Sequence, residues 1–314
     1  MKKIITIGES MALLASNAAG PLRFAKSLEL GFGGAEGNVA IALARQGTDV
    51  TWVSRVGDDE FGRLITSTMR GEGVDVRARV DEQRRTGLMV RETKRFDLLA
   101  VTYYRAESAA SALSELDLSE IDFASFDILH TTGITSAISQ SSRIMVRSAL
   151  AAAKAAGVKT TFDINYRAAL WSKAEAAEEI RALLPNVDVL FGGLDELQII
   201  AGDQTQDYVG LAANLRNQFD LDVVVKLGAE GAFALTSDGA EFAPAFSIKL
   251  ASPVGAGDAF VAGYLAGEVE NQPLNQKLIR ANATGAWVAS GFGDWESAPT
   301  KAELFKLTES DVAR

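Results

Sequence analysis

The chain has 314 residues, nearly half of them apolar, and a formal net charge of −10. This length is sufficient for one large α/β domain or two small ones with a sizeable buried core. The negative charge argues against nucleic acid or an acidic membrane surface as the main partner, because both attract basic patches. Cysteine is absent, which excludes disulfides and thiolate metal sites and fits a reducing compartment.

The first apolar run, 4–7, ends at Gly8-Glu9, too soon for a secretion signal, and is therefore predicted to be a strand. No stretch of the sequence is long and apolar enough to suggest a membrane span. We therefore expect a cytoplasmic protein without a membrane partner.

Short apolar runs alternate with alanine-rich helical stretches along the chain. The predicted strands are 4–7, 50–53, 128–131, 159–163, 187–191 and 223–226. The predicted helices are 35–46, 62–70, 141–156, 174–184, 207–219, 258–267, 274–291 and 301–307. This alternation predicts a parallel sheet with helices on both faces, in which ligands bind beyond the carboxyl ends of the strands. No repeat or long polar linker divides the chain, so we expect a single domain over residues 1–314.

Two segments, at about 9–30 and 84–106, interrupt the alternation. The second contains two strands with alternating polar and apolar residues, 87–92 and 101–105, joined by a polar turn. Such strands are typical of an antiparallel pair with one solvated face. We expect the two segments to form a small β lid that covers the carboxyl edge of the main sheet and excludes water. A partly apolar exposed lid face also predicts a homo-oligomer that pairs through its lids.

The stretch 252–263 places three small residues, Gly255, Ala256 and Gly257, directly before Asp258 and an apolar helix. Their N–H groups can converge on an anion at the positive end of the helix dipole, where small side chains let a phosphate approach. A carboxylate beside a phosphate suits one further task, which is to take the proton from an attacking hydroxyl. Asp258 is therefore a candidate general base for phosphoryl transfer. The alternative is an aspartate that only caps its helix.

Two more glycine-rich turns, Gly33-Gly34 and 226–231, lie next to predicted elements. Each lets a ligand approach the backbone, and each alone is equally compatible with an ordinary tight turn. The glycine spacing does not match a dinucleotide-binding fingerprint, and the sequence has no P-loop. His130 is the sole histidine and cannot build a histidine metal site alone, so we expect a structural role for it.

Polar clusters follow two predicted strands, at 103–105 (Tyr-Tyr-Arg) and 163–167 (Asp-Ile-Asn-Tyr-Arg). Arginine holds carboxylates or phosphates through paired hydrogen bonds, and tyrosine hydroxyls bind sugar oxygens. The clusters therefore predict contacts with an anion and with a sugar. The alternative is that Arg105 and Arg167 only pair with Asp163 or with surface acids.

Four separated motifs together resemble the signatures of the ribokinase-like (PfkB) carbohydrate kinases. They are Gly33-Gly34-Ala35 with Asn38, the run 226–231, Gly255-Ala256-Gly257-Asp258, and the run 282–286. Segments 103–105, 163–171 and 293–296 are further similar to the 2-keto-3-deoxygluconate kinases within that family. The resemblance covers essentially the whole chain and implies a three-layer αβα fold with a mostly parallel sheet and a small β lid. It also implies transfer of the ATP γ-phosphate to the 6-hydroxyl of 2-keto-3-deoxygluconate.

The resemblance implies roles for individual residues. Asp258 would deprotonate the sugar hydroxyl, and the amides of Gly255, Ala256 and Gly257 would form the anion hole. The residues implied to hold the sugar acid are Gly34, Asn38, Tyr103, Arg105, Arg167, Asp258 and Asp294. Those implied to bind ATP are Asn165, Lys226, Gly228, Gly231, Gly255, Gly257 and Asn282. Glu196 would act on Mg²⁺ only through water.

Three positions depart from the pattern of the family. Ser252 stands where relatives carry an aspartate that coordinates a monovalent cation, so dependence on K⁺ is left open. Gly193 replaces the asparagine of an Asn-x-x-Glu motif that ends at Glu196, which predicts a changed water network around Mg²⁺. Met89 stands where these kinases commonly place a lid tyrosine. The lost hydrogen bond, worth about 0.5–1.5 kcal/mol, predicts weaker binding or a different sugar acid.

Two other functions share part of this pattern. A fructokinase or ribokinase would carry the same motifs, although neutral sugars offer no carboxylate to Arg105 and Arg167. A non-catalytic sugar- or nucleotide-binding regulator would account for Ser252 and Gly193 but not for the intact 255–258 loop. We therefore expect an ATP- and Mg²⁺-dependent kinase of 2-keto-3-deoxygluconate or a close C4 epimer.

Overall fold

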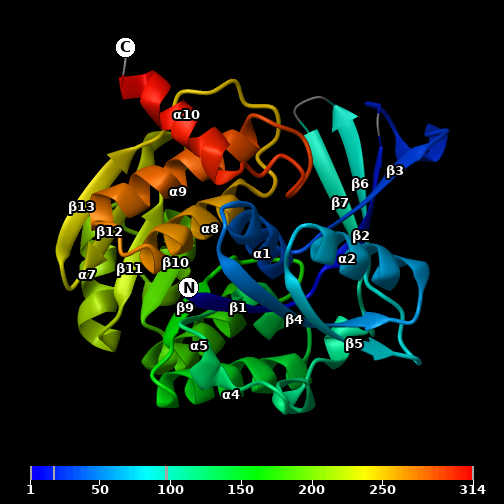
Figure 1. The fold of residues 1–314 in the computed structure, drawn as a ribbon, viewed down its shortest axis with the longest axis horizontal. Coiled ribbons are helices and arrows are strands. Elements are labelled where there is room, and N and C mark those ends of the chain that lie inside the picture. The colour runs from blue at the N-terminus through cyan, green and yellow to red at the C-terminus, as the bar shows by residue number, and fades with distance from the viewer. Residues whose placement is uncertain (1, 17, 96–97, 313–314) are drawn as a thin grey trace.

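The structure, a computed structural model, describes residues 2–16, 18–95 and 98–312, which form two sheets with helices around the larger one (Figure 1). The large sheet has the strand order β13-β12-β11-β10-β9-β8-β1-β4-β5. Its strands are β1 (Lys3–Ile7), β4 (Asp49–Gly57), β5 (Asp75–Asp81), β8 (Ile128–Thr132), β9 (Lys159–Asp163), β10 (Val189–Gly193), β11 (Asp222–Lys226), β12 (Gly231–Thr236) and β13 (Gly239–Pro244). Strands β5 to β11 in this order pair in parallel, whereas β12 and β13 add an antiparallel edge.

Helices cover both faces of the large sheet. One face packs against α4 (Gln140–Ala155), α5 (Lys173–Leu183), α6 (Leu194–Ala201) and α7 (Tyr208–Phe219). The other packs against α1 (Ala35–Arg45), α2 (Glu60–Gly71), α8 (Ala256–Val269) and α9 (Leu274–Ala289). The remaining helices are α3 (Gly133–Ala137), α10 (Lys301–Val312) and the 3₁₀ turns Leu22–Phe24, Ala110–Ala112, Glu115–Leu118, Phe123–Ser125, Leu184–Asn186 and Gly228–Glu230.

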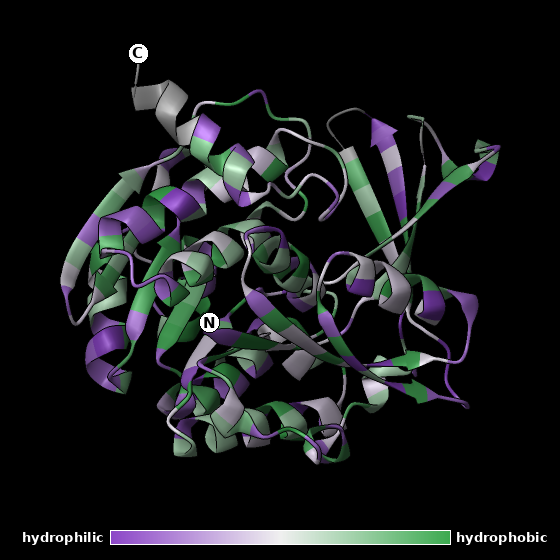
Figure 2. Ribbon diagram, in the orientation of Figure 1, coloured by the Kyte–Doolittle hydropathy of each residue, from purple (hydrophilic) through white to green (hydrophobic). Residues whose placement is uncertain are grey.

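The central strands β1, β8, β9, β10 and β11 are buried on both sides, because successive side chains point to opposite faces of the sheet and helices cover both faces. Ile5 and Ile7 of β1 share a core with α4 and α5, whereas Ile4 packs in the core beneath α1 and α8. Figure 2 shows hydrophobic residues along these strands, whereas polar ones gather on the outer surfaces of the helices. The predicted three-layer α/β fold is confirmed.

The small sheet is built from both of the segments that interrupt the alternation. Its strands are β2 (Met11–Ser16), β3 (Leu28–Gly33), β6 (Leu88–Arg95) and β7 (Leu98–Tyr104), in the order β3-β2-β6-β7. The β2–β3 and β6–β7 pairs are antiparallel, and β2–β6 is parallel. The sheet extends away from the large one beside α1 and α2 (Figure 1). The predicted polar turn between 92 and 101 falls partly outside the described residues.

The predicted strands and helices are all present with shifted ends, but the sequence analysis missed five elements. Strand β5 lies at an edge and is mostly polar, and β13 is largely exposed, so neither carries the apolar run of a buried strand. Strand β12 (GAFALT) is rich in glycine and alanine, which favour strands weakly. Helices α3 and α6 are too short for a clear helical period. Within the described ranges, none of the helices is both long and apolar enough to cross a membrane.

Candidate active site

Polar residues gather where the parallel strands end. Asp163 is the last residue of β9 and Lys226 the last of β11, and both lie beside β10 in the sheet register. Asn165 follows β9, and Asp258 lies in the first turn of α8. Because the carboxyl ends of parallel strands share one edge, residues distant in sequence meet there.

Two amides from different elements hold the carboxylate of Asp258. Asn38 on α1 donates from Nδ2 to Oδ2 at 2.8 Å, and Asn165 donates from Nδ2 to Oδ1 at 3.4 Å. Asn165 has a left-handed backbone (φ 40°), which turns its side chain toward α8. The Oδ1 of Asn38 accepts from the N–H of Gly34 at 3.4 Å, so the glycine-rich helix entry is part of the same network. Asp258 itself stays partly exposed.

Electrostatics make Asp258 an unusually basic carboxylate. Burial raises its pKa to about 6, and the nearby charge of Asp163 adds to the increase. The hydrogen bond from Asn38 and the charges of Arg167 and Lys226 act in the opposite direction. At neutral pH the group is therefore mostly ionised, yet it is far better able to accept a proton than an ordinary aspartate.

The loop before Asp258 presents N–H groups at the start of α8. The N–H of Ala256 makes one long bond to the carbonyl of Pro253 (3.4 Å). The N–H groups of Gly255 and Gly257 have no hydrogen-bond acceptor within the described part of the chain. Gly255 has φ +76°, and an added Cβ would lie 1.9 Å from the carbonyl oxygen of Asp294, so only glycine fits. The geometry leaves these N–H groups available to an anion.

A buried ion pair lies next to this loop. Lys226 donates from Nζ to both carboxylate oxygens of Asp163, at 2.7 and 2.8 Å. Burial lowers the pKa of Lys226, but Asp163 and Glu196 outweigh this and raise it overall, so the ammonium stays charged. The Nζ atom is 3.9 Å from the position of a Cβ on Gly257, which places a cation beside the loop. Asp163 is thus the partner of Lys226, not of the two arginines of the sequence clusters.

Glu196 is held by the backbone at the start of α6. Its Oε1 accepts from the N–H of Tyr166 (2.7 Å) and its Oε2 from the N–H of Gly193 (2.8 Å). Burial raises its pKa, while Lys226 lowers it. Across the described residues no cluster of three or more His, Asp or Glu side chains could hold a metal ion. This donor set fits Mg²⁺ bound mainly by phosphates and water, with Glu196 beyond its inner shell.

The two arginines of the sequence clusters differ in their surroundings. Arg167 is exposed, donates to the carbonyl of Tyr166 at 3.4 Å, and is close enough to Asp258 to lower its pKa. Arg105 is mostly buried and forms an ion pair with Glu9, whose Oε1 also accepts from Ser108 (2.7 Å). The sequence analysis did not single out Glu9, although its position two residues after the first strand was a usable signal.

Tyr103 and Asp294 approach the same region from two sides. Tyr103 is partly exposed, and its ring centroid lies 5.8 Å from Cζ of Arg105. Asp294 accepts from Nη1 of Arg91 on β6 at 2.6 Å. Burial raises the pKa of Asp294, and Arg91 lowers it. Arg91 was missed in the sequence, although it shares a strand face with Met89, the cross-strand partner of Tyr103.

The residues implied to bind ATP fall into two groups. Gly228 (φ +58°) has open space where a Cβ would be, which suits the close approach of a ligand. Gly231 (φ +125°) instead packs against the carbonyl of Ala243, only 2.1 Å from an added Cβ. Asn282 donates from Nδ2 to the carbonyls of Ala243 (2.9 Å) and Pro244 (3.0 Å). The structure therefore shows Asn282 supporting the end of β13, and a direct contact with ATP stays a prediction.

Met89, Ser252 and His130, which the sequence analysis discussed individually, make ordinary structural contacts. Met89 is buried with Met11 and other apolar residues of the small sheet. Ser252 accepts from the N–H of Val254 at 3.3 Å and so closes a local turn. His130 shares a hydrogen bond between Nδ1 and the hydroxyl of Thr161 (2.9 Å), and burial lowers its pKa to about 4. A neutral, buried histidine of this kind is a structural residue.

Glu36 is a fully buried carboxyl that the sequence analysis overlooked, two residues before Asn38 on α1. Its Oε1 accepts from the N–H and hydroxyl of Thr132 (3.0 and 2.8 Å) and from the hydroxyl of Thr135 (2.6 Å). Its Oε2 has no hydrogen-bond partner among the residues that the structure describes. A Cβ on Gly8 would lie 2.2 Å from Oε2, so glycine is required there. Burial raises the pKa of Glu36 to about 7.

Glu36 should make stability depend on pH. The carboxyl group of Glu36 stays protonated up to about pH 7 in the folded protein, whereas in the unfolded chain it loses its proton near pH 4.5. The free energy of unfolding therefore falls as the pH rises through this window, by up to about 3 kcal/mol. Glu36→Gln should make this fall between pH 5 and pH 8 smaller in urea unfolding, and Glu82→Gln, at an exposed site, should leave it unchanged. An unchanged slope in Glu36→Gln would contradict the argument.

The comparisons with known proteins agree with this fold and these motifs. The family model of the pfkB family carbohydrate kinases matches residues 1–301, and the chain belongs to this family. The predicted class, an ATP-dependent carbohydrate kinase, is thereby confirmed.

Similar proteins match nearly the whole chain. It is 33% identical over 304 residues to a 2-dehydro-3-deoxygluconokinase of Bacillus subtilis (strain 168), covering 96% of this chain and 93% of that protein. It is 32% identical over 294 residues to a 2-dehydro-3-deoxygalactonokinase of Haloferax volcanii, covering 93% and 92%. A structure from E. coli, assigned as ribokinase II in complex with ATP and Mg²⁺, has a TM-score of 0.91 over 99% of this chain and 100% of that one. At 22% identity, this last likeness shows the fold.

Proposed function

We propose that this enzyme transfers the γ-phosphate of ATP to the 6-hydroxyl of 2-keto-3-deoxygluconate. The observation that carries the proposal is the carboxylate of Asp258 next to the available N–H groups of 255–257 at the start of α8. The similarity to 2-dehydro-3-deoxygluconokinase supports the substrate. The galactonate-type relative and Met89 favour the C4 epimer, 2-keto-3-deoxygalactonate, as a second substrate to test.

In the proposed reaction, Asp258 takes the proton of the 6-hydroxyl of the sugar acid, and the hydroxyl oxygen attacks the γ-phosphorus of ATP. A new O–P bond forms, the bond to the β-phosphate oxygen breaks, and ADP leaves. The N–H groups of Gly255, Ala256 and Gly257 and the dipole of α8 hold the charge of the migrating phosphoryl group. Lys226, 3.9 Å from the Cβ position of Gly257, adds positive charge on the nucleotide side.

Mg²⁺ would neutralise phosphate charge when bound with ATP. Glu196 would orient water around it, because each of its carboxylate oxygens already accepts one backbone N–H and keeps further lone pairs. Ser252 offers no carboxylate to a monovalent cation. We therefore expect rates in potassium and in tetramethylammonium chloride to agree within about twofold, the scale of a general salt effect.

The sugar acid is proposed to lie between the small sheet and the strand ends. Arg167 is exposed, lies close enough to Asp258 to lower its pKa, and would pair with the carboxylate of the substrate. Tyr103 and Gly34 would line the sugar. Arg105 would act mainly through Glu9, which fixes its guanidinium behind the ring of Tyr103.

A coupled assay of ADP formation tests the substrate. Both keto-deoxy acids, gluconate, fructose and ribose should be compared by kcat/KM. We expect a keto-deoxy acid to exceed the neutral sugars by at least ~10²-fold, because a neutral sugar leaves Arg167 without a partner. A higher value for fructose or ribose would favour the fructokinase or ribokinase alternative. Sugar binding without ATP turnover would favour a regulator.

The pH profile tests the base. The acid limb of kcat/KM should have an apparent pKa near 6 and fall tenfold per pH unit below it, because protonated Asp258 cannot accept the hydroxyl proton. An acid limb near pH 4 would show that the pKa of the essential carboxylate is not raised. Ionisation of the sugar acid does not interfere, since its carboxylate titrates well below pH 5.

We propose that the chain folds as a single domain and that the small sheet is its lid. We also propose that the enzyme acts in the cytoplasm, where ATP is available. Met89 and Arg91 lie on the side of the small sheet that packs against Asp294, so the other side of the sheet is the outer face. It contains Leu28, Leu30 (55% exposed) and Tyr104 (62% exposed). We propose that this outer face pairs two copies of the chain. In analytical ultracentrifugation Leu30→Lys should sediment as a monomer.

A leucine of comparable exposure elsewhere gives the control for pairing. Leu116 is 66% exposed on a 3₁₀ turn away from the small sheet, and Leu116→Lys should sediment like the wild type. A monomeric wild type, or equal effects of the two substitutions, would contradict pairing through the lid.

A further inference from the structure

The segment after α9 lies between the small sheet and the body of the protein. On the side of the small sheet, Trp295 donates from Nε1 to the carbonyl of Phe32 on β3 at 3.0 Å, and the two rings are 4.9 Å apart. On the side of the body, Arg45 of α1 donates to the carbonyls of Glu296 and Ala298, each at 2.8 Å. The segment is therefore fixed from both directions.

Arg91 gives the small sheet a second hold on this segment. Its Nη1 is 2.6 Å from Oδ1 of Asp294, and the two side chains are only 17% and 8% exposed. A Cβ on Gly33 would lie 2.4 Å from Oδ2, the other carboxylate oxygen of Asp294. The same Cβ position is 3.0 Å from the methyl carbon of Met89. Strands β3 and β6 thus meet Asp294 in one closely packed contact.

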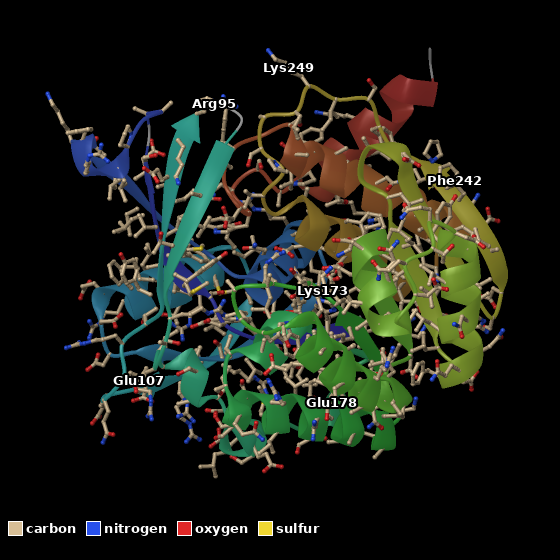
Figure 3. All side chains as sticks on the ribbon, turned by 180° about the vertical axis from the view of Figure 1, so that it is seen from behind. Arg95, Glu107, Lys173, Glu178, Phe242 and Lys249 are labelled. Atoms are coloured by element: carbon tan, nitrogen blue, oxygen red, sulfur yellow. The ribbon has the colours of Figure 1, made fainter. Side chains whose placement is uncertain are left out.

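The main chain of Asp294 in turn touches the anion-hole loop. Its carbonyl oxygen would be 1.9 Å from a Cβ on Gly255, the residue that caps α8. Contacts therefore run without interruption from β6, through Arg91 and Asp294, to the N–H groups before Asp258. Figure 3 shows the sheet that carries this contact, with Arg95 at its outer tip and Glu107 at its base.

We propose that Arg91 is a positioning residue that fixes the lid against the Gly255 turn through Asp294. It keeps the sugar pocket in register with the anion hole. Because the ion pair is mostly buried, removing the guanidinium leaves a carboxylate without its partner and loosens the contact between lid and body. The kinetic part of this inference depends on the proposed function.

The test compares Arg91→Gln with Arg91→Lys and with Lys94→Gln, a change at an exposed position of the same strand. Arg91→Gln should raise KM for the sugar acid at least ~10-fold and leave KM for ATP within about twofold, because the lid covers only the sugar. ATP hydrolysis without sugar should rise relative to transfer, since a loose lid admits water. Arg91→Lys should recover part of the loss, and Lys94→Gln should match the wild type.

Hydrogen exchange of the substrate-free protein gives a readout that needs no reaction. Amides of 28–33 and 88–95 should exchange faster in Arg91→Gln than in Lys94→Gln. Equal exchange, or equal increases in both KM values, would overturn the inference. A wild type that shows no activity on either keto-deoxy acid would refute the proposed substrate, while the exchange result would still decide the role of Arg91.

Discussion

Asp258→Asn is expected to lower kcat by at least ~10²-fold, the usual scale for a lost general base. The asparagine keeps the shape and can still accept from Nδ2 of Asn38, but it cannot take a proton at neutral pH. Stability should stay equal or rise, because burial already disfavours the charged form of Asp258. Steady-state kinetics and thermal unfolding on the same preparation separate these two effects.

A second aspartate provides the control. Asp195 lies exposed in the first turn of α6, as the second residue of that helix, and Asp258 is the third residue of α8, also in the first turn. If Asp258 only capped its helix, Asp258→Asn and Asp195→Asn would behave alike. Near-normal turnover of Asp258→Asn would refute the role of general base.

Gly255→Ala is expected to have the second largest effect. An alanine at φ +76° is strained by about 1–2 kcal/mol, and its Cβ would collide with the carbonyl of Asp294 at 1.9 Å. Either the loop or Asp294 must move, and a displacement of about 1 Å in positioned groups can cost ~10²-fold in rate. We therefore expect kcat to fall by about that factor and the melting temperature to fall as well.

Gly71 provides the matched control for the added methyl group. It ends α2, its backbone is not left-handed, and the space around its Cβ position is open. Gly71→Ala should leave kcat unchanged and stability equal or slightly higher. If Gly255→Ala keeps full activity, the N–H groups of this loop do not hold the migrating phosphoryl group.

The sequence predicted what depends on local pattern. The apolar runs of β8, β9 and β11 are buried on both faces and therefore read clearly as parallel strands. In the loop 255–258, the predicted anion hole and the predicted general base are four adjacent residues, so the motif can be found without knowledge of the fold. Even the small sheet was predictable, because alternation at 87–92 and 101–105 sets it apart from the buried strands.

Partners separated by long stretches of sequence could not be predicted. Arg105 was expected to hold substrate, yet its ion pair with Glu9 joins the ends of β1 and β7. Asp294 meets Arg91 only because the small sheet folds back toward the segment after α9. Such contacts depend on how elements pack in space, and one sequence without relatives carries no signal of that packing.

The position of the new phosphate is the most direct test of the account. Purified enzyme, ATP, Mg²⁺ and 2-keto-3-deoxygluconate should yield a product whose ³¹P signal couples to the two protons on C6. Asp258→Asn under the same conditions should yield almost none of it. A phosphate on another oxygen, or release of inorganic phosphate alone, would contradict the proposed transfer.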